Sequence, residues 1–313
     1  MLITCVVPCY NEEQSLPLFY RELIIVEMEM AKSFKVSFEN IFIDDGSKDN
    51  TLQVLKGIIA ENCDNRFLSF SKNFGKEAAI YAGLSESKGD FVVCLDADLQ
   101  HPPENIVTMF EILQKEDYDS VCMRRVSRKG EPMLRSFFAR QFYKIINRLS
   151  DTEIVDGATD YRMMSRSMAN SVLSLKEYNR FSKGIFSWVG FKTKWLDYVN
   201  VERIAGESKW SFFGLFKYAL EAIIAFSTTP LVVATFIGLI CFLAAFSMMA
   251  YIIIKKLLIG DPVQGYASTA AFLLGLGGMQ LFFMGIIGQY IAKIYLEVKG
   301  RPLYIVAEDS NDK

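Results

Sequence analysis

Two long stretches of this 313-residue chain contain no charged side chain, and they limit its possible folds more than any other feature. The first lies between Glu221 and Lys255, and the second lies between Asp261 and Lys293. A helix needs about 20 apolar residues to cross a bilayer, and both stretches exceed that length. The alternative is a pair of buried helices in a soluble core, which seldom run so long without a charge. We therefore expect membrane spans at about 230–254 and 267–292.

The residues before the first span are expected to stay in the cytosol. The chain begins MLITCVVP, which has neither the basic segment nor the cleavage site of a signal peptide. Two spans return the C-terminal tail to the same side, and Lys293, Lys299 and Arg301 agree with the positive charge typical of cytoplasmic loops. Lys255 and Lys256 between the spans oppose this orientation. The absence of an export signal decides the prediction in favour of a cytosolic N-terminal part.

The composition excludes several classes of protein. Hydrophobic residues make up 51% of the chain, charged residues 22%, and the formal net charge is -2. These values argue against a disordered chain and against a nucleic-acid partner. The six cysteines include no CxxC pair, which indicates buried thiols. Because His101 is the only histidine, a zinc site built from several histidines is excluded.

Short apolar runs alternate with helical patterns over residues 1–122. The expected strands are 3–8, 40–44, 66–70, 90–96 and 119–123, and the expected helices lie near 15–32, 51–62, 76–87 and 104–115. This alternation predicts an α/β fold with a mostly parallel sheet and helices on both faces. Such sheets bind ligands beyond the carboxyl ends of their strands, where polar residues gather in this sequence. Neither GxGxxG nor a P-loop motif is present.

One strand end carries a candidate metal site. Asp96 and Asp98 flank Ala97 directly after an apolar run, and Gln100 follows them. Two carboxylates and an amide oxygen are hard ligands suited to Mg²⁺ or Mn²⁺ beside a phosphate-bearing substrate. Such a pair is also common in loops and helix caps. Asp45, at another strand end, is a candidate for contacts to a nucleotide base or ribose, or a simple turn residue in Asp-Gly-Ser.

Two further segments have an amphipathic pattern. Residues 134–149 place apolar side chains largely on one side and basic ones mostly on the other, whereas 211–226 is apolar with two charges. Helices of this kind lie at the headgroup level of a membrane or pack against a sheet. The basic loop 124–129 is either a solvated charge run or an anchor for an anionic acceptor. Its position beside the basic segment 134–149 favours acceptor binding.

The sequence as a whole resembles the GT-A family 2 glycosyltransferases, and within them the polyprenyl-phosphate glycosyltransferases of the bactoprenol glucosyltransferase branch, which are related to dolichol-phosphate mannose synthase. The likeness rests on VVPCYNEE (6–13), IDDGSKDNT (43–51), NFGKEAA (73–79), LDADLQHPPE (95–104), TDYRMMSR (159–166), SWVGF (187–191), RIAGESKWS (203–211) and KGRPLYIV (299–306). Their order and spacing extend over nearly the whole chain. The QxxRW motif of the processive synthases is absent.

The resemblance implies roles for individual residues. Nucleotide-sugar binding is implied for Pro8, Tyr10, Glu12, Asp45, Lys76, Asp96, Ala97 and Asp98, and metal binding for Asp96, Asp98 and Gln100. Asp160 matches the acidic residue taken as the catalytic base, and Arg203 and Lys209 match basic positions that meet phosphates during catalysis. Arg124, Arg125 and Arg128, with Arg203, match the basic residues that hold the acceptor phosphate.

The expected activity is inverting transfer of a sugar from a UDP-sugar to undecaprenyl phosphate, with Mg²⁺ or Mn²⁺ as cofactor. Glucose is the favoured sugar, and UDP-GlcNAc as donor or a non-catalytic membrane scaffold are the alternatives. A lipid phosphate with a second pKa of about 6 is largely dianionic already, so Asp160 is either a base or an orienting group.

The same resemblance places the protein in the bacterial inner membrane as a multi-pass homo-oligomer, which we expect to be up to a tetramer. The expected parts are a cytosolic GT-A catalytic domain (1–205), an interfacial helix and linker (206–229), a two-helix membrane domain (230–294) and a cytosolic tail (295–313).

Overall fold

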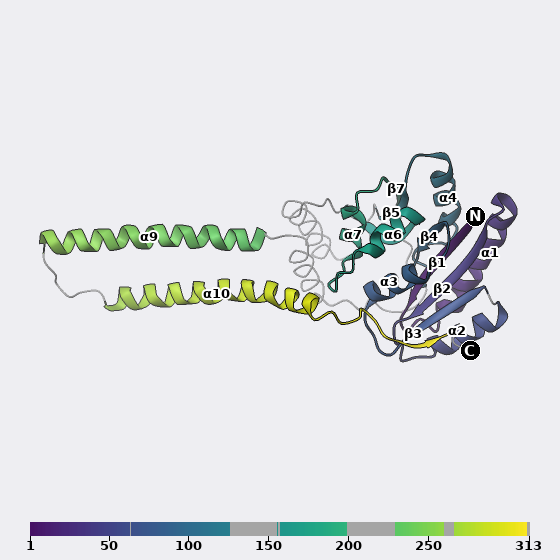
Figure 1. Cartoon of the computed structure of the whole chain (residues 1–313), viewed down its shortest axis with the longest axis horizontal. Helices are drawn as coiled ribbons and strands as arrows, with labels where there is room; N and C mark the ends of the chain where they lie inside the picture. The colour runs from purple at the N-terminus through teal and green to yellow at the C-terminus, as the bar shows by residue number, and fades with distance from the viewer. Residues whose placement is uncertain (63, 126–154, 156, 199–228, 260–265, 312–313) are drawn as a thin grey trace.

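The computed structural model describes residues 1–62, 64–125, 155, 157–198, 229–259 and 266–311. Figure 1 shows an α/β body from which two long helices, α9 and α10, project side by side. The segments 134–149 and 211–226, with their expected amphipathic helices, lie outside the described residues. The same holds for the boundary expected between the catalytic part and the linker at residue 205.

The α/β body is built on one eight-stranded sheet. Its strands lie in the order β7-β5-β6-β4-β1-β2-β3-β8. They are β1 (Leu2–Cys9), β2 (Ser37–Asp44), β3 (Asn65–Phe70), β4 (Phe91–Cys94), β5 (Ser120–Arg125), β6 (Ala158–Ser165), β7 (Thr193–Tyr198) and β8 (Val306–Asp309). Strands β1 to β4 pair in parallel, as does β7 with β5, which confirms the expected mostly parallel sheet. Strand β6 runs antiparallel between β4 and β5, and β8 runs antiparallel beside β3.

Helices cover both faces of this sheet, as the sequence predicted. On one face lie α1 (Leu16–Phe34), α2 (Thr51–Glu61) and α4 (Asn105–Lys115), and on the other lie α3 (Lys76–Glu86), α6 (Arg166–Ser174) and α7 (Ser182–Trp188). Because successive strand residues point to opposite faces, the central strands β1 to β4 and β6 supply side chains to both layers.

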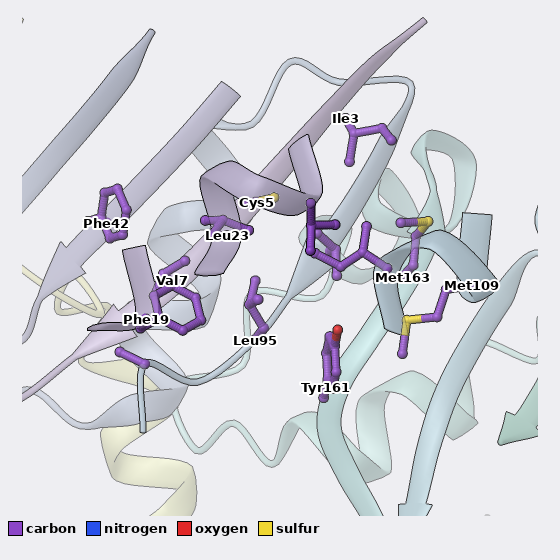
Figure 2. Close-up of a cluster of buried hydrophobic side chains, with 14 of the residues drawn as sticks. Ile3, Cys5, Val7, Phe19, Leu23, Phe42, Leu95, Met109, Tyr161 and Met163 are labelled. Atoms are coloured by element: carbon purple, nitrogen blue, oxygen red, sulfur yellow. The ribbon is translucent and has the colours of Figure 1, made fainter. Parts of the chain in front are cut away.

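Strand β1 illustrates this alternation. Its residues Cys5 and Val7 pack with Phe19 of α1 in the first core, which Figure 2 shows, whereas Val6 between them packs in the second. All three β1 side chains are fully buried. The apolar strands therefore stabilise two separate helical layers with one sheet.

Helix α3 packs unusually close to the sheet because it has a glycine where it crosses the strands. A Cβ on Gly83 would lie 2.2 Å from Val6 Cγ1 and 2.8 Å from Ile43 Cδ1. Both neighbours are buried in the second core. Any side chain at this position would push α3 away from β1 and β2, and α3 carries site residues at its N-terminal end.

The C-terminal helices α9 (Thr229–Ile259) and α10 (Tyr266–Val298) extend away from the sheet. Within the described residues, Gly275–Val298 of α10 is long and apolar enough to cross a membrane, and α9 contributes the shorter apolar stretch Leu231–Cys241. Large apolar side chains on both helices are exposed, for example Phe236 and Leu281 at 65% and 71%. An apolar surface of this extent indicates association with a membrane.

After α10 the chain returns to the α/β body. Glu297, near the end of α10, accepts hydrogen bonds from the backbone N–H groups of Tyr178 (2.9 Å) and Asn179 (3.2 Å). Strand β8 then pairs with β3, and Tyr304 stacks on Phe70 with ring centroids 4.9 Å apart. Part of the expected cytosolic tail is therefore an edge strand of the sheet.

Two glycine substitutions test the close packing of α3. We expect Gly83→Ala to lower the free energy of unfolding by about 1–3 kcal/mol, because its Cβ would overpack a full core. Gly57→Ala in α2 is the control, since a Cβ there meets nothing within 4 Å. That change should raise the free energy by about 0.5–1 kcal/mol, as alanine favours a helix. Urea unfolding of the detergent-solubilised protein measures both, and equal effects would contradict the packing argument.

Candidate active site

The carboxyl ends of neighbouring strands bring the candidate site together. Cys9 at the end of β1 pairs with Asp44 at the end of β2, and Cys94 at the end of β4 lies beside Val6 of β1. The segments that follow these strands carry Tyr10, Asp45 and Asp96, which therefore leave the sheet at the same edge. Because β6 is antiparallel to β4, with Arg162 opposite Cys94, Asp160 lies at this edge as well.

Strand alternation also decides which face Asp160 points to. Its neighbour Tyr161 is fully buried in the core under α1 and α4, as Figure 2 shows. Asp160 and Arg162 therefore face the opposite layer, where α3 and α7 lie. This places the carboxylate of Asp160 next to the first residue of α3, which is Lys76.

The Lys76 ammonium joins the two carboxylates. Lys76 Nζ lies 2.7 Å from Asp96 Oδ1 and 2.9 Å from Asp96 Oδ2. It also lies 2.7 Å from Asp160 Oδ2. The side chains of Lys76, Asp96 and Asp160 are 41%, 25% and 19% exposed, so this cluster lies at the surface of the body and is accessible to a ligand. Three side chains predicted separately therefore meet at one point.

The charged side chains of this cluster shift one another's pKa values. Burial alone lowers the pKa of Lys76, but the charges of Asp160 and Asp96 outweigh it and the pKa is raised. Burial alone raises the pKa of Asp160, but the positive charges of Lys76, Lys183 and Arg162 leave it well below its usual value. Both groups are therefore ionised through the neutral pH range.

Asp45 supports the loop that leads to Lys76. Its carboxylate accepts hydrogen bonds from the backbone N–H groups of Phe74 (2.7 Å) and Gly75 (3.0 Å), and Gly75 adopts a φ of +97° that favours glycine. Burial raises the pKa of Asp45 to about 6, and the two N–H groups oppose this rise. The structure thus gives Asp45 a turn-supporting role, and contact with a nucleotide stays a prediction.

Asp96, Ala97 and Asp98 form an Asp-X-Asp segment, here called the DXD segment, which follows β4. Ala97 is buried, and Asp98 accepts a hydrogen bond from the Gln100 backbone N–H at 3.1 Å. Leu99 between them has a φ of +57°, a rare conformation for leucine. Behind this segment His101 is buried, with its Nε2 2.7 Å from the hydroxyl of Tyr198 on β7. His101 therefore lies behind the metal-binding candidates and does not join them as a ligand in the structure.

The donor set of this segment fits a divalent cation that arrives with a nucleotide. No three Asp, Glu, His or Cys side chains gather around one point in the part of the chain that the structure describes. Mg²⁺ at nucleotide sites is nevertheless held by one or two carboxylates, and phosphate and water oxygens complete its coordination. Asp96 and Asp98, with the amide of Gln100, match that requirement. The hydrogen-bonded ammonium of Lys76 neutralises Asp96 in this structure.

The remaining predicted residues that the structure describes lie on or next to other strands and helices than Lys76, Asp96 and Asp160 do. Pro8 pairs with Ile43 in the sheet, and Tyr10 follows β1. Glu12 accepts a hydrogen bond from the hydroxyl of Ser15 just before α1. At the end of β5, Arg124 forms an ion pair with Asp197 of β7 at 2.7 Å, and Arg125 follows it. Arg128, Arg203 and Lys209 lie outside the described residues, so their expected roles stay predictions.

Three residues near Asp160 were not predicted as part of the site. Glu77 accepts a hydrogen bond at 2.8 Å from the backbone N–H of Ser182, the first residue of α7, and another from its hydroxyl. Lys183 and Arg162 act on Asp160 through their positive charge. For Arg162, its i+2 spacing from Asp160 on a strand is a usable signal. Glu77 and Lys183 come close to the site only because of how α7 packs, and no periodic sequence pattern predicts that packing.

Comparison with known proteins places these features in a family. The sequence profile described as Glycosyl transferase family 2 matches residues 4–173, and the profile described as GtrB C-terminal hairpin matches residues 229–294. The second match covers most of α9 and α10.

Curated relatives match over almost the full length. The SfII prophage-derived bactoprenol glucosyl transferase of Shigella flexneri is 42% identical over 98% of this chain and 97% of its own. The putative glycosyltransferase CsbB of Bacillus subtilis is 40% identical over 98% of this chain and 92% of its own. Glucosyl-3-phosphoglycerate synthase from Mycobacterium tuberculosis, solved with Mn²⁺, UDP-glucose and phosphoglyceric acid, is a weaker structural likeness, with a TM-score of 0.45, 18% identity and coverage of 71% and 77%.

The first profile match covers most of the α/β body and the second covers most of the hairpin, and the identity to the curated relatives extends over nearly the whole chain. The family expected from the motifs is therefore confirmed: the chain belongs to glycosyl transferase family 2 and carries the C-terminal hairpin of the GtrB type.

Proposed function

We propose that this enzyme transfers glucose from UDP-glucose to undecaprenyl phosphate, with inversion, at the cytosolic face of the bacterial inner membrane. The observation that carries the proposal is the ion pair of Lys76 with both Asp96 and Asp160. It joins the DXD carboxylate of the donor side to the carboxylate expected on the acceptor side. The near-full-length identity to proteins named bactoprenol glucosyl transferase supports glucose and the polyprenyl acceptor.

On the donor side, the nucleotide-sugar would lie along the strand ends. The residues expected to bind it are Pro8, Tyr10, Glu12, Asp45 and Lys76, with Asp96, Ala97 and Asp98 after β4. Asp96 and Asp98, assisted by Gln100, would hold Mg²⁺ or Mn²⁺. When bound, the cation neutralises the negative charge that develops on the leaving diphosphate. Lys76 supplies a second positive charge at the same point.

On the acceptor side, the role of Asp160 follows from its environment. A carboxylate whose pKa is held below its usual value is a weak base. The acceptor phosphate, with a second pKa of about 6, is largely dianionic at neutral pH and has no proton that must be removed. We therefore propose that Asp160 orients Lys76 and the acceptor. A phosphate oxygen forms the bond to the anomeric carbon while the bond to UDP breaks, and UDP keeps the electron pair.

The basic residues expected to hold the acceptor are Arg124 and Arg125 at the end of β5, with Arg128, Arg203 and Lys209. Guanidinium groups bind phosphate through paired hydrogen bonds, which suits a lipid phosphate monoester. The polyprenyl tail would remain in the bilayer beside the exposed apolar surface of α9 and α10. The homo-oligomer implied by the resemblance stays a prediction. Light scattering in detergent measures the mass of the assembly and tests it.

The direct experiment incubates the purified full chain with undecaprenyl phosphate, Mg²⁺ or Mn²⁺, and labelled UDP-glucose or UDP-GlcNAc in parallel. The proposal expects a chloroform-soluble product from UDP-glucose. A product from UDP-GlcNAc alone would show that the transferred sugar is GlcNAc and not glucose. No product from any labelled UDP-sugar would favour a non-catalytic scaffold.

The metal role is tested at Asp98. We expect Asp98→Ala to lower transfer by about 100-fold or more, because the charge on the leaving group would lose its stabilising cation. The control is Asp117→Ala, whose exposed carboxylate pairs with Lys192 and lies outside the candidate site. Both variants should keep the melting temperature of the parent protein. Undiminished transfer in excess EDTA would contradict a metal requirement.

The role of Asp160 is tested by separating binding from turnover. We expect Asp160→Asn to lower kcat by about 100-fold, because Lys76 and the acceptor lose an orienting charge. The affinity for UDP, measured by calorimetry, should change less than about twofold, since a group on the acceptor side contributes little to donor binding. If UDP affinity and kcat fell by the same factor, Asp160 would belong to the donor pocket.

A further inference from the structure

Helix α7 is tied to α3 by one side chain that the proposed reaction does not use. Glu77 is the second residue of α3. Its Oε2 accepts two hydrogen bonds from Ser182, one from the backbone N–H at 2.8 Å and one from the hydroxyl. Ser182 is 2% exposed, so this contact is shielded from water. The two residues lie far apart in sequence, and the contact therefore fixes the position of α7 relative to the start of α3.

The position of α7 matters because this helix carries Lys183 and packs against Arg162, two of the three positive charges that act on Asp160. Lys183 follows Ser182 directly and acts on Asp160 through its charge. Phe186, one turn later, is buried beneath Arg162, with the guanidinium carbon 3.9 Å from the ring centre. A shift of α7 would move Lys183 relative to Asp160 and would remove the packing of Phe186 against Arg162. Helix α3 holds the third cation, Lys76, next to Glu77 itself.

We propose that Glu77 is a positioning residue of the transfer reaction: in its ionised form it holds α7 through Ser182, so that Lys183 and Arg162 stay in place around Asp160. The inference rests on the proposed function for its kinetic part, since it assigns a role within that reaction. Glu77 does not touch the DXD carboxylates in any described contact, and its effect passes through α7.

The charge state of Glu77 is sensitive near neutral pH. Burial and the negative charge of Asp160 on β6 raise its pKa to about 7, while the Ser182 hydrogen bonds and Lys76 oppose the rise. Arg180, in the loop before α7, also faces Glu77; burial lowers the pKa of Arg180, and the negative charge of Glu77 opposes this lowering. Below pH 7 the carboxyl gains a proton and accepts hydrogen bonds less well, so the hold on α7 weakens as pH falls.

The test compares Glu77→Ala with Glu77→Gln. The glutamine side chain is neutral at every pH and resembles the protonated carboxyl, so its carbonyl oxygen accepts the Ser182 hydrogen bonds more weakly than a carboxylate does, whereas alanine loses the contact. We expect Glu77→Ala to lower kcat at pH 8 by about tenfold or more with the KM for UDP-glucose changed less than about twofold, because the acceptor side is misplaced. Glu77→Gln should lower kcat at pH 8 less than Glu77→Ala does, because the weaker hydrogen bonds to Ser182 remain.

The pH profile separates this role from the titration of the acceptor phosphate. The parent kcat should fall as pH drops from 8 to 6, and in Glu77→Gln that fall should shrink to the part contributed by the phosphate. Glu86→Gln is the matched control, since Glu86 ends the same helix and pairs with Arg66 at 3.1 Å away from the site. It should keep the parent profile. Adding Ser182→Ala to Glu77→Ala should cost little more than Glu77→Ala alone.

Amide hydrogen exchange of residues 182–188 gives a readout that needs no turnover. At pH 8, exchange should rise in Glu77→Ala, and it should rise by less in Glu77→Gln. The inference is overturned if Glu77→Ala keeps the parent kcat and exchange, or if Glu77→Gln keeps the parent pH profile. Failure of the proposed function appears instead as no labelled lipid from the parent protein, and the exchange result then still decides whether Glu77 holds α7.

Discussion

The site depends on one ammonium group placed between two carboxylates. Asp96 comes from the loop after β4, Asp160 from β6 and Lys76 from the start of α3, so three separate parts of the chain must be held in register. Two carboxylates this close would repel each other, and the Lys76 charge removes that cost. The antiparallel course of β6 next to β4 makes the arrangement possible, because it returns Asp160 to the edge where the parallel strands end.

Sequence patterns predicted the parts of this protein that depend on local hydrophobicity. The expected strands at 3–8 and 40–44 and the expected helices near 51–62 and 76–87 are confirmed to within a few residues, because buried parallel strands are near-continuous apolar runs. Strands β6, β7 and β8 carry polar or exposed residues and pair with distant partners, so no local pattern marks them. Asp96 and Asp160 were predicted from motifs. Glu77 and Lys183 could not be predicted in this way, because only the packing of α7 brings them to the site.

The membrane part and the catalytic part are in direct contact. Glu297 of α10 binds the backbone at Tyr178 and Asn179, and Lys293 donates to the Asn179 side chain at 2.8 Å. These residues lie just before Phe181 and Ser182, where α7 begins. The end of the apolar helix therefore meets the body close to the element that carries Lys183. Such a contact sets how the site faces the bilayer surface, where a lipid-linked phosphate has to enter.

Strand β8 lies beyond the hairpin in sequence but belongs to the sheet in space. A ribosome therefore delivers the last strand only after both helices α9 and α10 have been made. Until then the backbone of β3 is open along Leu68–Phe70, and Phe70 lacks its stacking partner Tyr304. Unpaired edges of this kind invite pairing with other chains. Completion of the catalytic sheet thus waits until the whole hairpin has been synthesised.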